Sequence, residues 1–274
     1  MISKIFTQNT ILIFLASFLL VSCGDVSTGQ SIDDILASEH RTEKYIERDK
    51  FRHPKETLLF FGVTPDKKVV EITPGMGWYA EILAPYLRDK GHYYYASYDL
   101  SVVKNPYFVK IENAFKDIIK QKPEVFQKLN WVHFDPNSPN FAPDGPVDMV
   151  LTFRNVHNWA KAGSAEAMFL GFAQALKSGG TLGVVEHRAK PGTPLEKQIK
   201  SGYMTEEYVV SLAESAGFRL DATSEINANP QDTADHPGGV WNLLPNLRGV
   251  SEADKDAMLK VGESDRMTLR FIKE

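Results

Sequence analysis

The stretch Val69-Val70-Glu71-Ile72-Thr73-Pro74-Gly75-Met76-Gly77-Trp78 decides the fold class. An apolar run ends in an acid, a Gly-x-Gly turn follows, and the residues after the turn have a helical pattern. Glycines let a backbone turn tightly and approach a ligand closely, and the free amides of a helix N-terminus favour anionic groups. The stretch therefore predicts a strand, a loop and a helix that bind a nucleotide-like ligand.

From Lys68 onward, strand patterns alternate with helix-length patterns, as in a parallel sheet covered by helices on both faces. The expected strands are 68–73, 92–98, 130–134, 147–153, 180–187 and 218–225, and the expected helices are 78–89, 112–121, 163–177 and 204–216. The alternating residues Arg266 to Ile272 predict a further, edge strand. The fold class is therefore α/β, a Rossmann-like, doubly wound, mostly parallel seven-stranded sheet.

Helical patterns precede the first strand. Ser31 is followed by acids, as at a capped helix start, and the polar helical pattern continues to Asp49. Pro54 suits the first position of a second helix, which ends at Gly62. Segment 226–250 has little periodicity, but its Trp and Leu residues argue that it packs. We expect a signal peptide at 1–22, a tether at 23–30, a helical extension at 31–62 and one α/β domain at 63–274.

The first residues have the pattern of an export signal. Lys4 precedes the apolar run 11–21, which is too short for a comfortable membrane-spanning helix. The run ends in LVSC, which resembles a bacterial lipobox, so we expect lipid on Cys23 after cleavage. Cys23 is the only cysteine, so an internal disulfide is excluded. Gly24 in place of Asp favours the outer membrane of a bacterial envelope, facing the periplasm. The alternative is an uncleaved anchor with an incidental cysteine.

The glycine loop fits two cofactors. Gly75-x-Gly77-x-x-Ala80 matches the dinucleotide fingerprint, and Asp99 lies roughly 20 residues on, where that fingerprint has an acid. Glu71 disfavours NAD, because the strand of an NAD loop runs apolar into its first glycine. The choice of cofactor must also explain the acids at the ends of the second and third expected strands. It must explain the turn sequence LKSGG as well.

VVEITPGMG resembles the first motif of class I S-adenosylmethionine-dependent methyltransferases, in which the strand ends in an acid and the glycine turn passes under the methionine part of the cofactor. Thr73 stands where the family has its usual first glycine. ASYDL, VHFDP and LKSGGTLGVVEH resemble the family's later strand ends. The resemblance implies S-adenosylmethionine as cofactor. The cofactor-binding residues that it implies are Glu71, Thr73, Gly75, Gly77, Trp78, Asp99, Asp135, Arg154 and Asn155.

The fourth strand region, VDMVLTFRNVHNW, resembles methyltransferases of small molecules, and it lacks the Asn-Pro-Pro-aromatic motif of nucleic-acid amino-methylases. A net charge of −4 and the absence of a Lys/Arg run also argue against a nucleic-acid partner. FRHPKETLLFFG, SEINANP and GESDRMTL resemble a little-described group of exported methyltransferases. This resemblance covers nearly the whole mature chain but names no substrate. The small-molecule acceptor is implied by the resemblance of the fourth strand region.

Two histidines are candidates for catalysis. His157 follows the fourth expected strand and His187 ends the fifth, and open α/β folds bind ligands at this edge. Transfer to a hydroxyl benefits from a base with a near-neutral pKa, for which His is the usual choice. The alternative is that each histidine fixes a loop through hydrogen bonds. Trp78 and Tyr79 can face the cationic sulfur through cation–π contact, or can simply pack.

Charged residues near both ends of the domain are candidates for the acceptor site. These are Arg52, His53 and Arg266, the last of which closes the motif 263–266. A structural salt-bridge network is the alternative. Scattered histidines raise the question of a metal, but neither HExxH nor close paired spacing is present, so we expect none.

The sequence therefore predicts a lipid-anchored methyltransferase that uses S-adenosylmethionine and a small-molecule acceptor. The export signal raises a difficulty, because this cofactor is made in the cytoplasm. The first alternative is an envelope protein on a methyltransferase fold that binds a nucleoside-like or metal ligand without methyl transfer. An NAD-dependent oxidoreductase is a further alternative, which Glu71 and LKSGG disfavour.

Overall fold

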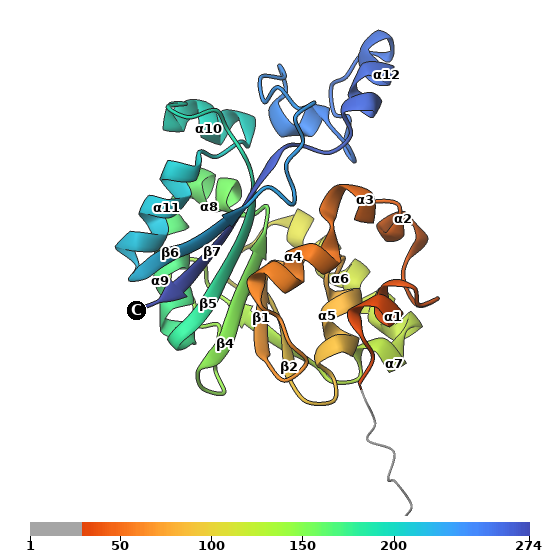
Figure 1. The fold of residues 1–274 in the computed structure, drawn as a ribbon, viewed down its shortest axis with the longest axis vertical. Coiled ribbons are helices and arrows are strands. Elements are labelled where there is room, and N and C mark those ends of the chain that lie inside the picture. The colour runs from red at the N-terminus through yellow and green to blue at the C-terminus, as the bar shows by residue number, and fades with distance from the viewer. Residues whose placement is uncertain (1–28) are drawn as a thin grey trace, which may run out of the picture.

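The computed structural model describes residues 29–274, so the predicted signal peptide and Cys23 lie outside the described residues. Seven strands form one sheet in the order β3-β2-β1-β4-β5-β7-β6 (Figure 1). Strands β1 to β5 pair in parallel, and β7 is antiparallel to both β5 and β6. The predicted α/β fold with a mostly parallel seven-stranded sheet is confirmed.

The expected strands are all present. Their bounds are β1 Lys68–Ile72, β2 His92–Tyr98, β3 Leu129–Phe134, β4 Val147–Phe153, β5 Leu176–His187, β6 Phe218–Ser224 and β7 Arg266–Lys273. β5 takes in the LKSGG stretch, for which the sequence predicts a turn, because Leu176 pairs with Val147 across a register shift. The expectation that the last strand lies at the edge is wrong, since β7 lies between β5 and β6. Its first four residues are all buried, as in a strand covered on both faces.

Helices flank the sheet on both sides (Figure 1). Those after β1 are α5 Ala80–Leu87, α6 Pro106–Gln121, α7 Pro123–Phe126, α8 Val156–Ala162, α9 Ala165–Ala175, α10 Leu195–Ser201, α11 Glu206–Ser215 and α12 Glu252–Val261. The four expected helices correspond to α5, α6, α9 and α11. α6 begins well before the expected 112, because Asn105 caps its first turn and Pro106 occupies its first position.

Between residue 29 and the sheet, the described chain forms four short helices: α1 Ile32–Leu36, α2 Glu43–Ile46, α3 Asp49–Arg52 and α4 Pro54–Phe61. The continuous helical pattern expected up to Asp49 is therefore wrong. The chain leaves helical geometry before Thr42, whose backbone N–H donates to the Glu81 carboxylate of α5 at 2.8 Å instead of to a helical carbonyl. This contact ties the N-terminal segment to the helix that follows the glycine loop.

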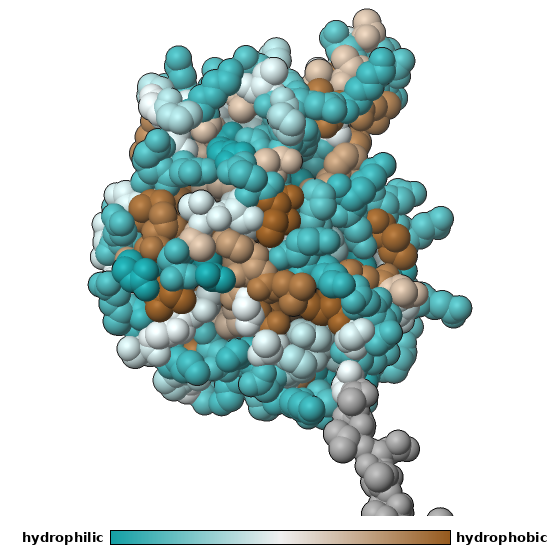
Figure 2. All heavy atoms as spheres, viewed as in Figure 1, coloured by the Kyte–Doolittle hydropathy of each residue, from teal (hydrophilic) through white to brown (hydrophobic). Residues whose placement is uncertain are grey.

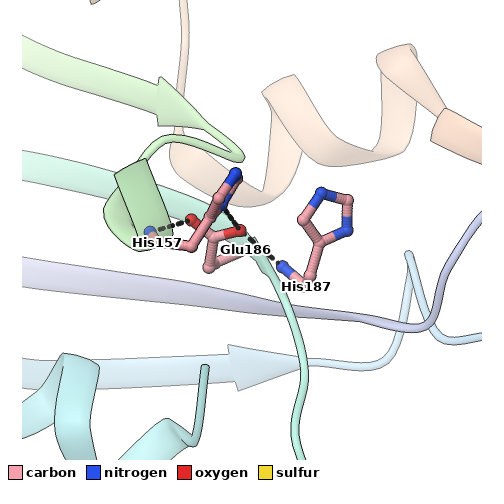
Figure 3. Close-up of side chains that lie close together, drawn as sticks. All are labelled: His157, Glu186 and His187. Atoms are coloured by element: carbon pink, nitrogen blue, oxygen red, sulfur yellow. Dashed lines mark hydrogen bonds and ion pairs between the residues drawn. The ribbon is translucent and has the colours of Figure 1, made fainter. Parts of the chain in front are cut away.

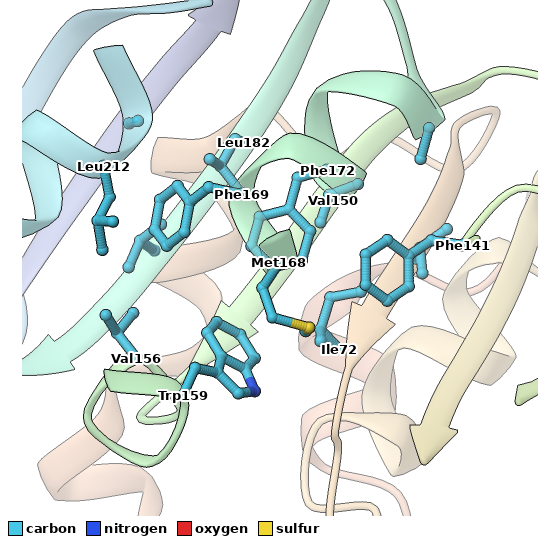
Figure 4. Close-up of a cluster of buried hydrophobic side chains, with 14 of the residues drawn as sticks. Ile72, Phe141, Val150, Val156, Trp159, Met168, Phe169, Phe172, Leu182 and Leu212 are labelled. Carbon is cyan, nitrogen blue, oxygen red and sulfur yellow. The ribbon is translucent and has the colours of Figure 1, made fainter. Parts of the chain in front are cut away.

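Two hydrophobic layers cover the two faces of the sheet. One cluster joins the sheet to α8, α9 and α11, and Figure 4 shows Trp159, Met168 and Phe172 interleaved with strand residues such as Val150. The other cluster joins the sheet to α5, α6 and the N-terminal helices. Phe61 of α4 belongs to it and is 1% exposed. The helices within 31–62 therefore share their core with the sheet.

The segment between β6 and β7 carries the 3₁₀ helix η1 Gly239–Asn242 and then α12. α12 projects from the body at the top of Figure 1, and none of its residues is buried. Figure 2 shows mostly hydrophilic side chains on this face, interrupted by apolar patches across its middle. Within residues 29–274, no helix is both long and apolar enough to cross a membrane.

Candidate functional site

A cavity of about 760 Å³ opens at the carboxyl ends of the parallel strands. Residues that follow β1, β4 and β5 line it, together with part of the segment between β6 and β7. The strand order reverses between β1 and β4, and open α/β sheets bind ligands at such a reversal. The volume falls within the range of roughly 300–1,000 Å³ that is usual for small-molecule and cofactor sites.

The structure brings together most of the residues predicted for the site. Those that line the cavity are Arg52, Glu71, Thr73, Gly75, Trp78, Arg154, Asn155, His157 and His187. Those that do not line it are Gly77, Asp99, Asp135, His53 and Arg266. Parallel strands end at one edge of the sheet, which explains why residues so far apart in the chain meet there.

The glycine loop after β1 has an unusual backbone at the cavity wall. Thr73, which stands at the family's glycine position, has a φ of 47°, and Gly75 has a φ of 67°. A β-branched residue in this region is strained, and such strain concentrates at functional sites. The Thr73 hydroxyl is buried without a hydrogen-bond partner among the described residues. A Cβ on Gly75 would meet open space, so the loop leaves room at the cavity.

Gly77 serves packing instead of the cavity. It has a φ of 81°, and a Cβ placed on it would lie 2.3 Å from the Phe115 ring of α6. Only glycine lets the loop pass this close to α6. Tyr95 of β2 holds the loop from the other side by donating its hydroxyl to the Gly75 carbonyl.

Glu71 is a buried acid at the cavity wall. It is 3% exposed, and its only hydrogen bond among the described residues comes from the Tyr93 hydroxyl at 2.7 Å. Burial raises its pKa from 4.5 to about 8, against the opposing effects of the Tyr93 hydrogen bond and the charge of Arg154. Glu71 is therefore largely protonated at neutral pH in the free protein, and a cation bound beside it would favour its ionised form.

Asp99 and Asp135 follow β2 and β3 as expected, but neither lines the cavity. Asp99 accepts hydrogen bonds from the backbone and hydroxyl of Ser101, and Asp135 accepts two from Asn137. Both carboxylates close local turns in this structure. Ser97 of β2 lies on the cavity wall near this point instead.

The residues after β4 reach the cavity by a second strained turn. Arg154 has a φ of 64°, and its backbone N–H donates to Val185 of β5. Asn155 donates its amide to the Ile72 carbonyl at 3.0 Å, which ties the end of β4 to the end of β1. Burial lowers the pKa of Arg154 to about 10, although the nearby Glu263 carboxylate opposes this shift.

His157, Glu186 and His187 form a cluster at the ends of β4 and β5 (Figure 3). Glu186 is fully buried and accepts hydrogen bonds from the backbone N–H of both histidines and from His157 Nδ1 at 3.1 Å. A carboxylate that accepts this bond places the proton of neutral His157 on Nδ1. The other ring nitrogen, Nε2, lies on the side of the ring away from Glu186 in Figure 3. His157 is thus oriented so that its Nε2 lone pair has no hydrogen-bond partner among residues 29–274.

His187 is held differently. Its Nδ1 lies within hydrogen-bond distance of the Ser264 hydroxyl, and its ring centroid lies 5.4 Å from that of His157. Burial lowers the pKa of His187 well below 6.5, and the charges of His157 and the nearby arginines add to this effect. His187 therefore stays neutral at physiological pH.

The three residues of this cluster also satisfy the simplest distance test for a metal site, because one ligand atom from each lies within 4.8 Å of the others. Glu186 already accepts three N–H hydrogen bonds. Positive charges from Arg154, Arg266 and Arg52 face His187. A divalent cation would meet repulsion here, so the electrostatics favour an anion or a neutral ligand.

The aromatic residues that open α5 have partners within the protein. Trp78 donates its indole N–H to the Tyr45 carbonyl, and the Arg52 guanidinium lies 4.8 Å from its ring centroid. Tyr79 stacks on Phe153 with ring centroids 3.8 Å apart. Packing, the alternative reading of these two residues, accounts for both rings.

A cluster of charged side chains around Glu263 forms part of the cavity wall. Glu263 accepts hydrogen bonds from Arg48, Arg52 and Arg266. Burial by itself would raise the pKa of Glu263, but the surrounding arginines lower it to about 2. Arg266 also donates to the Ser264 and Phe51 carbonyls, so all three of its nitrogens have partners. This agrees with the salt-bridge alternative for Arg266. His53 ends α3 with a φ of 41° and does not line the cavity.

Some residues that shape the site were not predicted from the sequence as part of it. Glu186 is the acid that orients His157, and its signal was an acid inside an apolar strand, as at Glu71. Trp241 and Leu244 enter the wall from segment 226–250, and the Trp241 ring lies 6.3 Å from that of His157. The signal there was apolar side chains within an unusually long loop.

No known family model matches the chain, and no curated protein does. Several solved structures are similar to it in fold. A SAM-dependent methyltransferase from Aquifex aeolicus is 17% identical with a TM-score of 0.52, covering 72% of this chain and 94% of its own. The glycopeptide N-methyltransferase MtfA, complexed with S-adenosyl-L-homocysteine, is 13% identical with a TM-score of 0.51, covering 82% of this chain and 90% of its own.

Human N-acetylserotonin methyltransferase, in complex with SAM, is 14% identical with a TM-score of 0.50, and the match covers 89% of this chain and 56% of that one. Identities this low show the fold alone. The chain thus has the Rossmann-like fold of the SAM-dependent methyltransferases.

Proposed function

We propose that the chain is an S-adenosylmethionine-dependent methyltransferase that acts on a small molecule. One observation carries the proposal: a single cavity joins the glycine loop and Glu71 on one side to the oriented His157 on the other. A methyl donor and an acceptor can therefore meet within it. Solved structures of the same fold contain SAM, S-adenosyl-L-homocysteine or sinefungin, which supports this choice of cofactor.

The residues at the loop fit such a cofactor. The unpartnered Thr73 hydroxyl offers a hydrogen-bond donor and acceptor, and the open space at Gly75 admits a ligand. A sulfonium or ammonium group bound beside Glu71 would favour the ionised form of its carboxyl. Asp99 and Asp135 stay predicted cofactor-binding residues, and each would exchange its turn hydrogen bonds for ligand contacts.

Bound S-adenosylmethionine supplies an electrophilic methyl group on a cationic sulfur. The protein orients the acceptor and removes its proton. His157 Nε2 accepts the proton of an acceptor hydroxyl, while Glu186 keeps the ring in place and stabilises the imidazolium. His187, which stays neutral, does not compete for this proton. The rings of Tyr79, Phe153 and Trp241 line the cavity and give the acceptor an apolar surface.

We also propose that the chain is held at the periplasmic face of a bacterial outer membrane by lipid on Cys23. The support is the LVSC pattern after an apolar run, and acyl chains contribute about 0.8 kcal/mol per buried methylene. An exported enzyme of this kind depends on cofactor that reaches the envelope.

The first prediction concerns the cofactor. Gly75→Asp, whose residue type tolerates positive φ, should place a carboxylate in the loop and weaken S-adenosylhomocysteine binding by roughly tenfold or more, since a like charge disfavours the ligand carboxylate. Calorimetry measures this affinity. Gly192→Asp is the matched control, because Gly192 also has a positive φ, 73°, and open space but lies outside the cavity. Equal binding by the two variants would show that the loop is not the site.

The second prediction concerns pH. The pKa of Glu71 is raised, so its contribution to stability is present below pH 4.5 and is lost as pH rises through about 8. A bound cationic cofactor favours the ionised form of Glu71 instead of the protonated form. The affinity of the protein for this cofactor should therefore rise roughly tenfold or more between pH 6 and 8. In Glu71→Gln, the same titration should lose this rise, and unfolding in urea should depend less on pH. Parallel pH profiles for the two proteins would contradict the assignment.

The third prediction concerns His157. With an acceptor hydroxyl in an activity assay, His157→Ala should lower kcat by about 10²-fold or more. Glu186→Gln should lower kcat less and shift the pH profile, because it changes how the imidazole is held and not the base itself. The control His92→Ala removes an exposed histidine outside the cavity. Unchanged turnover in His157→Ala would remove it from catalysis.

The fourth prediction concerns Cys23. Cys23→Ala should release the protein from the membrane fraction of the expressing bacterium, because the lipid attachment point is lost. Immunoblots of separated membrane and soluble fractions measure this. A variant that stays with the membranes through washing would contradict lipid attachment.

A further inference from the structure

Four arginines surround one carboxylate beside the cavity. Arg48, Arg52 and Arg266 bond Glu263, and the charge of Arg154 also reaches it. Buried charges are normally paired, so this group leaves an excess of positive charge. Arg41 and Lys122 do not add to the excess, because Asp49 and Glu81 pair with them.

Two of the arginines face the cavity and have unused donors. Arg52 is 3% exposed, lines the cavity, and has a buried Nη2 without a hydrogen-bond partner among residues 29–274. Arg154 lines the cavity, and its side chain donates no hydrogen bond within the described part of the chain. A buried guanidinium nitrogen without a partner is costly. The low pKa values of both, about 9 for Arg52 and about 10 for Arg154, have burial as their largest cause.

The other acids of the cavity wall do not offset this charge. Glu71 is largely protonated when free, and Glu112 pairs with Lys116 and lies near His133. The wall also carries the exposed cations Lys161 and Arg248, which make no ion pair among the described residues. The cavity wall therefore carries more positive than negative charge.

The cofactor alone does not neutralise this wall. The carboxylate of S-adenosylmethionine is accompanied by its own ammonium and sulfonium groups, so the molecule carries a net positive charge. Ionisation of Glu71 on binding matches that charge at the glycine loop. The excess positive charge at Arg52 and Arg154 is then available to bind the second ligand, the methyl acceptor.

The same arginines lie near the two histidines, one of which is the candidate base, His157. Arg154, Arg266 and Arg52 all lower the pKa of His187, after burial and His157, and the two histidine rings lie 5.4 Å apart. The rings of Phe153 and Trp241 line the cavity alongside. One small molecule can thus contact an arginine, an apolar wall and His157 together.

We propose that the methyl acceptor is an anionic hydroxy compound, whose carboxylate or phosphate group binds Arg52 and Arg154 while its hydroxyl faces His157. This inference rests on the proposed function and names the chemical class of its acceptor. Guanidinium groups bind both oxyanions through paired hydrogen bonds. The apolar wall accommodates the body of the molecule between the two polar ends.

The test uses the full chain saturated with S-adenosylhomocysteine, and calorimetry with 4-hydroxybenzoate, 4-hydroxyphenyl phosphate and neutral phenol. At least one anionic probe should bind about tenfold or more tightly than phenol, as expected for one charge-assisted hydrogen bond. Arg154→Gln should remove the difference between the anionic probes and phenol. Folding should be kept, because the Arg154 side chain makes no hydrogen bond within residues 29–274. Arg219→Gln removes an exposed arginine outside the cavity. This control variant should keep the difference in affinity between the anionic probes and phenol.

Equal affinities for the anionic probes and phenol would overturn the proposal. So would an Arg154→Gln variant that weakens S-adenosylhomocysteine but not 5′-methylthioadenosine, which lacks the carboxylate, because the arginines would then bind the cofactor. If S-adenosylhomocysteine does not bind at all, the probes are compared without it. An Arg154-dependent preference for the anion would then support the anion site and overturn only the methyltransferase proposal.

Discussion

The antiparallel pairing of β7 with β5 is the interaction on which the site depends. It places Arg266 opposite His187, so the segment before β7 arrives at the carboxyl edge of the parallel strands. Ser264 and Glu263 reach the cavity wall by this route. An edge position, as the alternating sequence suggested, would have left these residues away from His157. The insertion of one strand therefore brings Glu263 and Ser264 to the cavity that Arg52 also lines.

Several groups at this cavity are in states that cost stability. Glu71 is a buried acid with a raised pKa, Thr73 has a strained backbone and an unpartnered hydroxyl, and Arg52 has an unpartnered nitrogen. Elsewhere in the core, apolar layers cover both faces of the sheet. The rigid sheet holds these polar groups in place, and each would gain a partner from a charged ligand.

The candidate site was predictable wherever a residue ends a parallel strand. Glu71, Arg154, Asn155, His157 and His187 all do so or follow directly, and all line the cavity. Asp99 and Asp135 end strands too, yet their carboxylates turn back to their own loops. The partner of His157 was not predictable, because that hydrogen bond joins α8 to β5 and depends on the register in which β5 pairs with β4. Segment 226–250 has no periodicity from which its position could be derived.

The sequence by itself determined the fold class, since a strand, a glycine turn and alternating elements carry local patterns of period and turn chemistry. It also determined the resemblance to methyltransferases through short motifs at strand ends. Tertiary structure alone decided which charges meet. Arg52 and Glu263 are joined by a buried hydrogen bond although the chain separates them by 211 residues. Burial, which depends on every element packed around a group, then set the protonation of Glu71 and His187.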